Sequence, residues 1–537
     1  PLPEVVSSSA LMLDESPSGS GLENIVQSAP PLRSPGNSND PDFYSGTSTY
    51  SSFFDSNYVT NVRDQIYTKN GNRYDSNNCW IFATLAAFES ALLNNYSAFQ
   101  NNKPNLSEEH TRLSILKGSS PSDNEYKYIS DSYNVSGSPD KAISYLTRCQ
   151  KYGPVYEHNS LNFGNNSNDD ILSNITLQRC DYYPTSIVSL ENSTDNSLSN
   201  PDYSLLWDRV SEIKELINDN KNVIVNYKEG FNYDHMFNDL GNNNKKLYTE
   251  NIRTTYHYNY DNTGSDHSIE LVGWDDSIDY SQIVEDGSYL PNNKLPKHKG
   301  AFIAKNSYGE YFNYGHYAGA SFTTDGYMYI SYDESNFLDD IKSFKQLETR
   351  SNLGTIYEND PLGKCLIRNP REISCDNSSS LNKTFVVSRF EPEQGEELLK
   401  RVYLNTTDKE TRFKIFVSPT GEFSDFTEAE LNYGNIIIGR DANGYYANKA
   451  GEYVFELKRP YYINSDSFLV GIEYYNGSGI GITVEANTYG LEDNSDIYSA
   501  PQLLSEHAYI MKPIEGNNTE EVWRRNENNY IDRKSVV

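Results

Sequence analysis

Hydrophobic and polar positions divide the chain into an early part with helical patterns and a longer part with strand patterns. Four alanines among closely spaced large apolar residues predict a helix over residues 79–94. A second helix is predicted to begin near Ser107, which can cap it ahead of two glutamates. A third is predicted over residues 205–218.

From residue 222 onward, short apolar runs separated by turn residues predict strands. These runs are residues 223–225, 269–272, 301–304, 326–332, 384–388, 412–417, 435–438, 452–457 and 468–474. The later strands are short and regularly spaced by turns, which is typical of an all-β sandwich. We therefore expect an α+β protein with a domain boundary near residue 350.

The charge of the chain excludes several classes of partner. Its 537 residues contain 45 Lys and Arg against 75 Asp and Glu, which gives a net charge of −30. A field of that sign repels phosphates, so we expect no nucleic-acid partner and no docking on anionic lipid. No apolar run approaches the roughly 20 residues that a membrane span needs. The 44 Tyr and 22 Phe can build a largely aromatic core.

The first 46 residues differ in composition from the rest. They are rich in Ser, Pro, Gly and Asn and are expected to form an extended leader or a propeptide remnant. The chain begins at Pro1 without an apolar signal core, so we expect a processed or trimmed product. Few charges with many Tyr and Asn favour a secreted or cell-surface protein.

Four residues in order along the chain carry candidate chemistry: Gln65, Cys79, His267 and Asn306. Cys79 begins the first predicted helix, where the positive end of the helix dipole favours a thiolate. A His near the thiol would complete its activation, and an Asn amide can orient the ring. A Gln amide and the backbone N–H of Cys79 could bind an oxyanion. Taken singly, each residue also has a purely structural interpretation.

The sequence around these residues strengthens the catalytic interpretation. The segments VRDQ, CWIFATLAAFES, LSEEH, DHSIELVGWDD and GAFIAKNSYG occur in one order and resemble papain-like cysteine peptidases over about residues 50–345. The resemblance implies Cys79 as nucleophile, His267 as base and later acid, Asn306 as orienting residue and Gln65 as oxyanion donor. It also implies a two-lobed fold over residues 47–350, with a helical left lobe and a β-rich right lobe.

The chain departs from that family at several positions. Gln65 lies 14 residues before Cys79, where about six are usual. Asn78 stands where Ser is common, and Tyr308 replaces the Trp that shields the His–Asn hydrogen bond. The family's double glycine, which pairs with the substrate backbone, is reduced to Ser136-Gly137.

The expected substrate-binding residues are Asn78, Gly137, Asp266 and Tyr308.

The five cysteines are an odd number, so at least one thiol is unpaired within the monomer. Disulfide bonds Cys149–Cys180 and Cys365–Cys375 would leave Cys79 as the single free thiol. That arithmetic suits a secreted thiol enzyme, although connectivity is not fixed by sequence.

The C-terminal part has a resemblance of its own. From Thr355, residues 351–537 look like the lectin-like β-sandwich that follows some prokaryotic papain-like peptidases. The resemblance implies a cell-surface glycan as partner. A sandwich that only braces the peptidase is weighted equally, because fold does not fix function.

We therefore expect a secreted or surface cysteine endopeptidase that hydrolyses protein or peptide substrates and needs no cofactor. No HExxH, CxxC pair or Walker loop is present, so no catalytic metal site is predicted. The acidic pairs at 275–276 and 339–340 are candidates for structural calcium, but a solvated acidic face is favoured.

Two other classes remain open. The fold could serve as the scaffold of an adhesin or carbohydrate-binding protein, although that role has no need for Cys79, His267 and Asn306 together. A transglutaminase-like acyl transferase would share the Cys and the His, but it typically has Asp where this chain has Asn306.

Overall fold

The computed structural model describes most of the chain between residues 52 and 536. The described residues are 52–69, 72–115, 137–147, 154–158, 178–190, 203–229, 234–236, 255–259, 264–278, 296, 298–309, 326–338, 341–358, 366–368, 383–393, 395–406, 408–409, 411–434, 439–475, 482–486, 508–511, 523–524, 529–531 and 534–536. The predicted leader at 1–46 and the predicted strand at 435–438 lie outside them.

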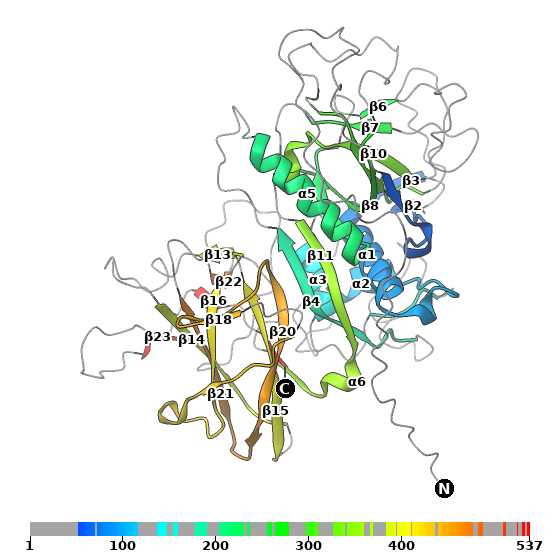
Figure 1. Cartoon of the computed structure of the whole chain (residues 1–537). Helices are drawn as coiled ribbons and strands as arrows, with labels where there is room; N and C mark the ends of the chain where they lie inside the picture. The colour runs from blue at the N-terminus through cyan, green and yellow to red at the C-terminus, as the bar shows by residue number, and fades with distance from the viewer. Residues whose placement is uncertain are drawn as a thin grey trace.

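The described helices are few and lie in the first two thirds of the chain (Figure 1). They are α1 (Cys79–Asn95), α2 (Glu108–Ile115), α3 (Pro139–Thr147), α5 (Tyr203–Asn220) and the short α6 (Arg350–Leu353). Short 3-10 turns are Ser56–Tyr58, Ser97–Phe99, Ser335–Leu338 and Phe423–Asp425. All three predicted helices are confirmed, and α3 and the short α6 were not predicted. None of the helices described is long and apolar enough to cross a membrane.

Eleven of the described strands form one sheet. Its order is β15-β20-β4-β11-β5-β8-β9-β10-β7-β6, with β1 added beside β8. The strands are β1 (Ser52–Phe54), β4 (Tyr182–Leu190), β5 (Val223–Tyr227), β6 (Asp234–Met236), β7 (Thr255–His257), β8 (His267–Asp275), β9 (Ala301–Lys305), β10 (Tyr327–Ser331), β11 (Ile341–Thr349), β15 (Glu397–Thr406) and β20 (Ala450–Ile463). Neighbours are antiparallel except for β10 and β7, which are parallel.

A second sheet follows the order β18-β19-β16-β21-β14-β23-β24, with β17 beside β16. Its strands are β14 (Lys383–Phe390), β16 (Arg412–Ser418), β17 (Thr427–Ala429), β18 (Gly439–Asp441), β19 (Gly444–Tyr446), β21 (Phe468–Tyr475), β23 (Ala508–Met511) and β24 (Trp523–Arg524). Smaller sheets pair β2 (Ile66–Lys69) with β3 (Asn72–Asp75), β12 (Ile356–Glu358) with β26 (Lys534–Val536), and β22 (Ile482–Ala486) with β13 (Leu366–Arg368) and β25 (Asn529–Ile531). The predicted strands that fall on described residues are confirmed, so the protein is a β-rich mixture of strands and few helices.

Helix α1 is buried on nearly all sides, which its sequence explains. A helix that is apolar around its whole circumference is stable only inside a protein. Successive side chains of a strand point to opposite faces, and Ile187 of β4 packs with the α1 core while Val188 packs with the α5 core. Helices therefore cover both faces of the sheet near β4 and β11 (Figure 1).

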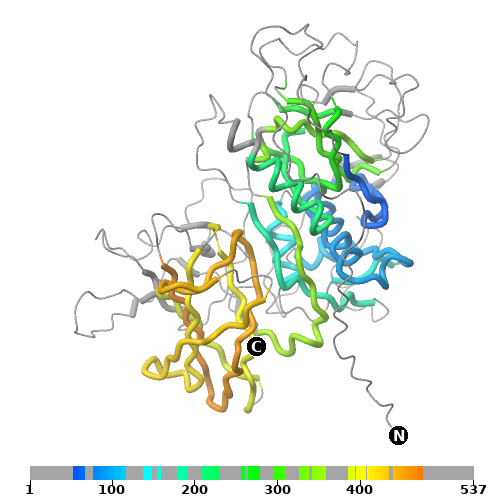
Figure 2. Tube along the Cα trace, viewed as in Figure 1, coloured from blue at the N-terminus to red at the C-terminus, as the bar shows by residue number. Residues whose placement is uncertain are grey.

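The large sheet continues from the early part of the chain into the late part. The first residues of β20 pair antiparallel with β4, from Ala450 opposite Ser189 to Tyr453 opposite Ser186. Gly451 has φ 152, and a Cβ built there would lie 2.1 Å from the Ile187 carbonyl oxygen, so this close pairing needs glycine. Figure 2 shows the C-terminal strands lying against the early part of the trace. This pairing was not predicted from the sequence.

One cysteine prediction needs correction. Cys180 is a free, fully buried thiol, so the predicted Cys149–Cys180 disulfide is not formed. Burial raises the pKa of Cys180 to about 11, although a hydrogen bond to Tyr156 opposes the shift. Cys180 packs in the same core as α1, where a small apolar side chain suffices. Cys149, Cys365 and Cys375 lie outside the described residues.

Candidate active site

Cys79 is the first residue of α1 and is 8% exposed. The helix starts here because the carbonyl of Asn78 accepts from the N–H groups of Ile81 and Phe82 at 2.8 and 3.2 Å. Asn77, just before, has φ 51, a left-handed conformation that Asn tolerates better than most residues. The turn therefore directs the thiol to the N-terminal end of a buried helix.

His267 begins β8 and is 4% exposed. Its Nε2 lies 2.7 Å from Oδ1 of Asn306, the residue after β9. The same Oδ1 accepts the backbone N–H of Ser307 at 2.8 Å, which identifies it as the amide oxygen. Nε2 must therefore carry the proton and donate, so the imidazole has a defined orientation.

Two tyrosines enclose the His267 ring. Tyr308 stacks on it with centroids 5.0 Å apart and an interplanar angle of 8°. Tyr227 of β5 meets it edge-on at 5.3 Å and 83°. The Tyr308 hydroxyl donates to Oε2 of Glu229 at 2.7 Å. The ring is thus held by aromatic contacts on two sides and by an amide at one edge.

The charges around His267 favour its protonated form. Burial disfavours a charged ring, but the negative charges of Cys79 and Glu229 outweigh it, together with hydrogen bonds to Cys79 and Asn306. The net effect raises the pKa of His267 to about 10. The imidazole is therefore suited to an ion pair with a thiolate at neutral pH.

Gln65 also reaches this region and is buried. Its Oε1 accepts from the Ser307 hydroxyl at 2.7 Å, and its backbone N–H donates to the Ser307 carbonyl at 2.7 Å. The hairpin of β2 and β3 occupies the residues between Gln65 and Cys79. This hairpin accounts for the spacing of 14 residues.

The remaining predicted site residues lie at different positions. Asn78 is fully buried behind Cys79, and Gly137 lies against the indole of Trp80, where an added Cβ would be 2.4 Å from the ring. Asp266 is exposed and pairs with Lys228 at 2.5 Å. Any residue other than glycine at position 137 would therefore collide with the Trp80 indole.

Buried charges connect α1 and α2 to the strands that carry His267 and Asn306. Arg63 forms ion pairs with Glu89 of α1 and Glu108 of α2. Lys305 of β9 donates to Thr60 at 2.9 Å and lies 3.6 Å from Glu270 of β8. Burial raises the pKa of Glu270 to about 7, although Lys305 opposes the shift.

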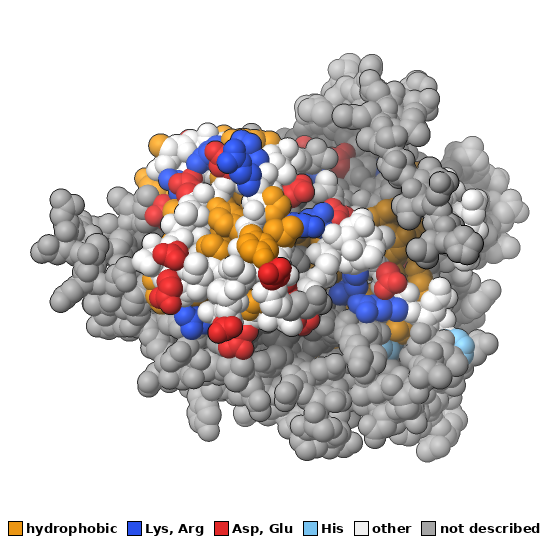
Figure 3. Space-filling view, turned by 90° about the horizontal axis from the view of Figure 1, so that it is seen from below, with side chains coloured by type: hydrophobic (Ala, Val, Ile, Leu, Met, Phe, Trp, Pro, Cys, Tyr) orange, Lys and Arg blue, Asp and Glu red, His pale blue; other side chains and the backbone are white. Residues whose placement is uncertain are grey.

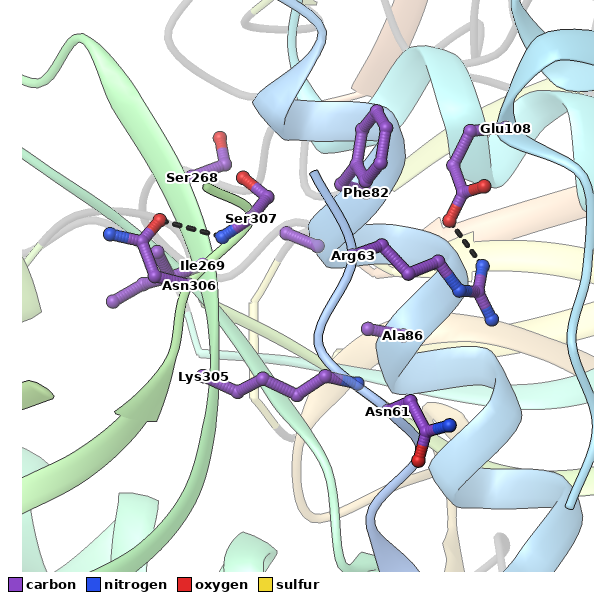
Figure 4. Close-up of a pocket in the computed structure, with 11 residues that line it drawn as sticks. Asn61, Arg63, Phe82, Ala86, Glu108, Ser268, Ile269, Lys305, Asn306 and Ser307 are labelled. Carbon is purple, nitrogen blue, oxygen red and sulfur yellow. Dashed lines mark hydrogen bonds and ion pairs between the residues drawn. The ribbon is translucent and has the colours of Figure 1, made fainter. Parts of the chain in front are cut away.

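Figure 4 shows this region around a small cavity of about 20 Å³, roughly the space of one water molecule. Lys305 extends from its strand toward the segment that holds Asn61, and Arg63 points at Glu108. Sequence reasoning missed these ion pairs and Glu229. The available signal was a charged residue inside an otherwise apolar segment, as with Glu270 in HSIELVGW.

A metal centre has no donor set in the described part of the chain. No group of three His, Cys, Asp or Glu side chains there could hold a metal ion. Asp276, half of one predicted calcium candidate, pairs with Lys214 at 2.6 Å and accepts from Tyr332 at 2.7 Å. The candidate at 339–340 lies outside the described residues.

The comparisons with known proteins concern the fold. No family model and no curated protein sequence matches the chain. The fold is similar to the clostridial cysteine protease Cwp84 after propeptide cleavage, with a TM-score of 0.58 and 16% identity over 89% of this chain and 96% of that chain. A second structure holds the cysteine protease and lectin-like domains of Cwp84, a surface layer associated protein of Clostridium difficile. It has a TM-score of 0.55 and 16% identity over 89% of this chain and 86% of that chain.

The predicted resemblance to a papain-like peptidase with a lectin-like domain is thus confirmed at the level of fold.

Proposed function

We propose that the chain is a two-lobed papain-like cysteine peptidase with a C-terminal lectin-like sandwich. The observation that carries the proposal is the bond of 2.7 Å between His267 and Asn306, on a ring that also hydrogen-bonds Cys79 at the start of α1. The left lobe would comprise α1 to α3, and the right lobe would comprise the strands from β5 to β10.

Acylation begins with the Cys79 thiolate. Its sulfur attacks the carbonyl carbon of the scissile peptide, a C–S bond forms, and the carbonyl electrons move to the oxygen. Nε2 of His267 is engaged by Asn306, so Nδ1 is the nitrogen that faces the thiol. The Nδ1 proton passes to the leaving amine as the C–N bond breaks, which leaves an acyl-enzyme and neutral His267.

Deacylation reverses the roles. Neutral His267 takes a proton from water, the oxygen of that water attacks the thioester carbonyl, and the C–S bond breaks. The products are the carboxylic acid, the Cys79 thiolate and protonated His267, so the enzyme returns to its starting state. Asn306 keeps the ring orientation in both steps without adding a charge.

The developing oxyanion needs donors in a fixed geometry. The Ser307 hydroxyl holds Oε1 of Gln65, so the NH₂ group of the same amide is the one directed elsewhere as a donor. We assign that NH₂ group and the backbone N–H of Cys79 to the oxyanion. The backbone N–H of Ser307 also donates to Asn306, so Ser307 holds both the proposed oxyanion donor and the residue that orients His267.

The test compares the two free thiols of the described residues. An epoxide inhibitor should label Cys79 alone, and Cys79→Ala should fold normally and lose peptide hydrolysis. The matched control is Cys180→Ala, because burial raises the pKa of Cys180 and keeps that thiol unreactive. Hydrolysis that survives in Cys79→Ala, or a label that moves to Cys180, would contradict the assignment.

The C-terminal part supports a second role. We propose that the protein acts at the cell surface or outside the cell and binds glycans through residues 351–537. Two observations support this: the fold is similar to that of Cwp84, a surface layer associated protein with a lectin-like domain, and Tyr433 and Tyr462 are exposed, at 62% and 50%. Figure 3 shows hydrophobic side chains gathered among charged ones on the lower face. Tyrosine rings of this kind can stack on sugars.

A glycan array probed with the full chain tests this role. Binding that falls in Tyr433→Ala or Tyr462→Ala, with peptide hydrolysis unchanged, would support it. An array without signal for the folded native chain would leave the sandwich as a brace for the peptidase.

A further inference from the structure

Glu229 follows β5 and lies beside the proposed catalytic pair, and no motif of the sequence drew attention to it. Its Oε2 accepts from the Tyr308 hydroxyl at 2.7 Å. Tyr308 in turn lies flat on His267, with an angle of 8° between the rings. The Glu229 backbone N–H donates to Asp266, the residue before His267, at 2.8 Å. Glu229 thus contacts both neighbours of the imidazole.

Tyr308 acts on His267 in two ways, one through its ring and one through its hydroxyl. Its ring covers one face of His267 and, being 6% exposed, limits access of water to that face. Its hydroxyl reaches past the ring to a carboxylate, so the ring cannot rotate without breaking a hydrogen bond to a charged acceptor. Such bonds are stronger than those between neutral groups.

We propose that Glu229 and Tyr308 form a positioning pair for His267, in which Glu229 fixes the Tyr308 ring against the imidazole and adds negative charge beside it. The inference rests on the proposed function and deepens it, because the pair would maintain the protonated imidazole that acylation consumes. Glu229 acts through position and charge and takes no part in bond making.

The electrostatics agree with this geometry. After burial, which disfavours the charged ring, Cys79 and then Glu229 contribute most to the raised pKa of His267. The titratable groups that contact the ring or act on it through their charge are Cys79, Glu229, Tyr227 and Tyr308, and Lys228 and Asp266, next to Glu229 and His267 in the chain, pair with each other. Lys228 is neutralised by Asp266, so Glu229 is the carboxylate whose charge reaches the imidazole.

The experiment follows the ring directly. In a chain whose histidines carry ¹³C at Cε1, the NMR signal of His267 is assigned by its loss in His267→Ala. The pH at the midpoint of its titration is then measured. In a Cys79→Ala background, which removes the competing thiolate, Glu229→Gln should lower the midpoint by about one pH unit. Tyr308→Phe keeps the stacked ring and should lower it less. In the native background, the alkaline limb of kcat/KM should move to lower pH in the same order.

Controls and a double variant make the pair falsifiable. Glu430→Gln removes one exposed carboxylate far along the chain and should leave the midpoint unchanged, and Glu229→Asp should restore part of the shift. In Glu229→Gln with Tyr308→Phe, the effect should be smaller than the sum of the single effects, because the two residues act as a unit. If Glu229→Gln does not fold, Tyr308→Phe decides alone.

The outcomes separate the two proposals. A midpoint that does not move in Glu229→Gln and Tyr308→Phe, with peptide hydrolysis intact, would overturn the positioning pair only. A midpoint that falls as expected in a chain that neither hydrolyses peptides nor reacts with the epoxide would support the pair and overturn the proposed function.

Discussion

Three buried histidines in or beside the large sheet are of two kinds, and their partners differ. His267 bonds to the neutral amide of Asn306 and lies beside Cys79. His298 bonds to the carboxylate of Asp333 at 2.5 Å, and that carboxylate also accepts the backbone N–H of His298 at 2.7 Å. His257 lies 3.2 Å from the carboxylate of Glu334. Of these three rings, that of His267 also hydrogen-bonds the thiol of Cys79.

The difference bears on the proposed role of His267 in proton transfer. A carboxylate partner orients the ring and also compensates its charge, which ties that ring to one structural role. An amide partner orients the ring and leaves its charge to be balanced by whatever else is near. For His267 the nearby charges are those of Cys79 and Glu229, so the protonation of the ring is coupled to the thiol and to that carboxylate and not to its orienting residue.

The largest effects are expected when the imidazole of His267 or of His298 is removed. His267→Ala should reduce kcat/KM by at least about 1,000-fold, because the proposed proton donor and acceptor is lost. Its free energy of unfolding should change by about 1–2 kcal/mol, because one hydrogen bond and some packing are lost. Peptide hydrolysis and thermal unfolding measure the two quantities.

His298→Ala is the matched variant at the other site. Asp333 would lose a ring donor while remaining buried, so the free energy of unfolding should fall by about 3 kcal/mol. The residual folded protein should keep its kcat/KM near the native value. Equal losses of kcat/KM in His267→Ala and His298→Ala would contradict the distinction between a histidine that transfers protons and one that only stabilises the fold.

Exchanging the partner sharpens the comparison. Asn306→Ala should lower kcat/KM by about 10- to 100-fold, because a hydrogen bond to the charged imidazole is lost. Asn306→Asp gives His267 a carboxylate partner like that of His298 and should move the alkaline limb of the pH profile to higher pH. The sign follows because added negative charge stabilises the protonated ring. A limb that moves to lower pH in Asn306→Asp would contradict this account.

Local sequence was sufficient to predict the elements around the site. The apolar run from Cys79 predicted α1, and the runs after His267 and before Asn306 predicted β8 and β9. The apolar residues within each of these segments are enough to predict its secondary structure, so no knowledge of the tertiary structure is needed. The resemblance to a known family rested on the same short segments.

Long-range contacts were out of reach for the same reason. Glu229 lies 38 residues before His267, and the pairing of β20 with β4 joins residues more than 250 apart. Neither contact leaves a periodic signature. The free Cys180 was missed because counting cysteines says nothing of which thiol is buried in an apolar core.

Glu270 extends the comparison to a carboxylate on the same strand as His267. Burial raises its pKa from 4.5 to about 7, so the folded chain binds this proton more tightly than the unfolded chain does. Its contribution to stability is therefore present below pH 4.5 and is lost as the pH rises through 7. Glu270→Gln mimics the neutral form, and its melting temperature should exceed the native value by about 2 °C at pH 8 and by less at pH 5.

Thermal unfolding at the two pH values measures this effect. Glu430→Gln is the control, because Lys458 lowers the pKa of that exposed carboxyl and no gain at pH 8 is expected. A gain for Glu270→Gln that shrinks as the pH rises would show that Lys305 holds Glu270 charged in the folded chain.

Asn77 offers the smallest test, at the turn that places Cys79. Its φ of 51 costs an ordinary residue about 1 kcal/mol, while Asn and Gly adopt this conformation more readily. Asn77→Gly should therefore leave the free energy of unfolding within about 0.5 kcal/mol, because relief of strain and added freedom of the unfolded chain nearly cancel. Asn77→Ala should lower it by about 1 kcal/mol, whereas Asn101→Ala, at another exposed asparagine, should stay within about 0.5 kcal/mol.

Denaturant titration separates the three variants, and equal stability of Asn77→Ala and Asn77→Gly would show that the turn carries no strain. A loss of kcat/KM in Asn77→Ala beyond its loss of stability would mean that the backbone at this turn positions the thiol as strictly as Asn306 positions the imidazole.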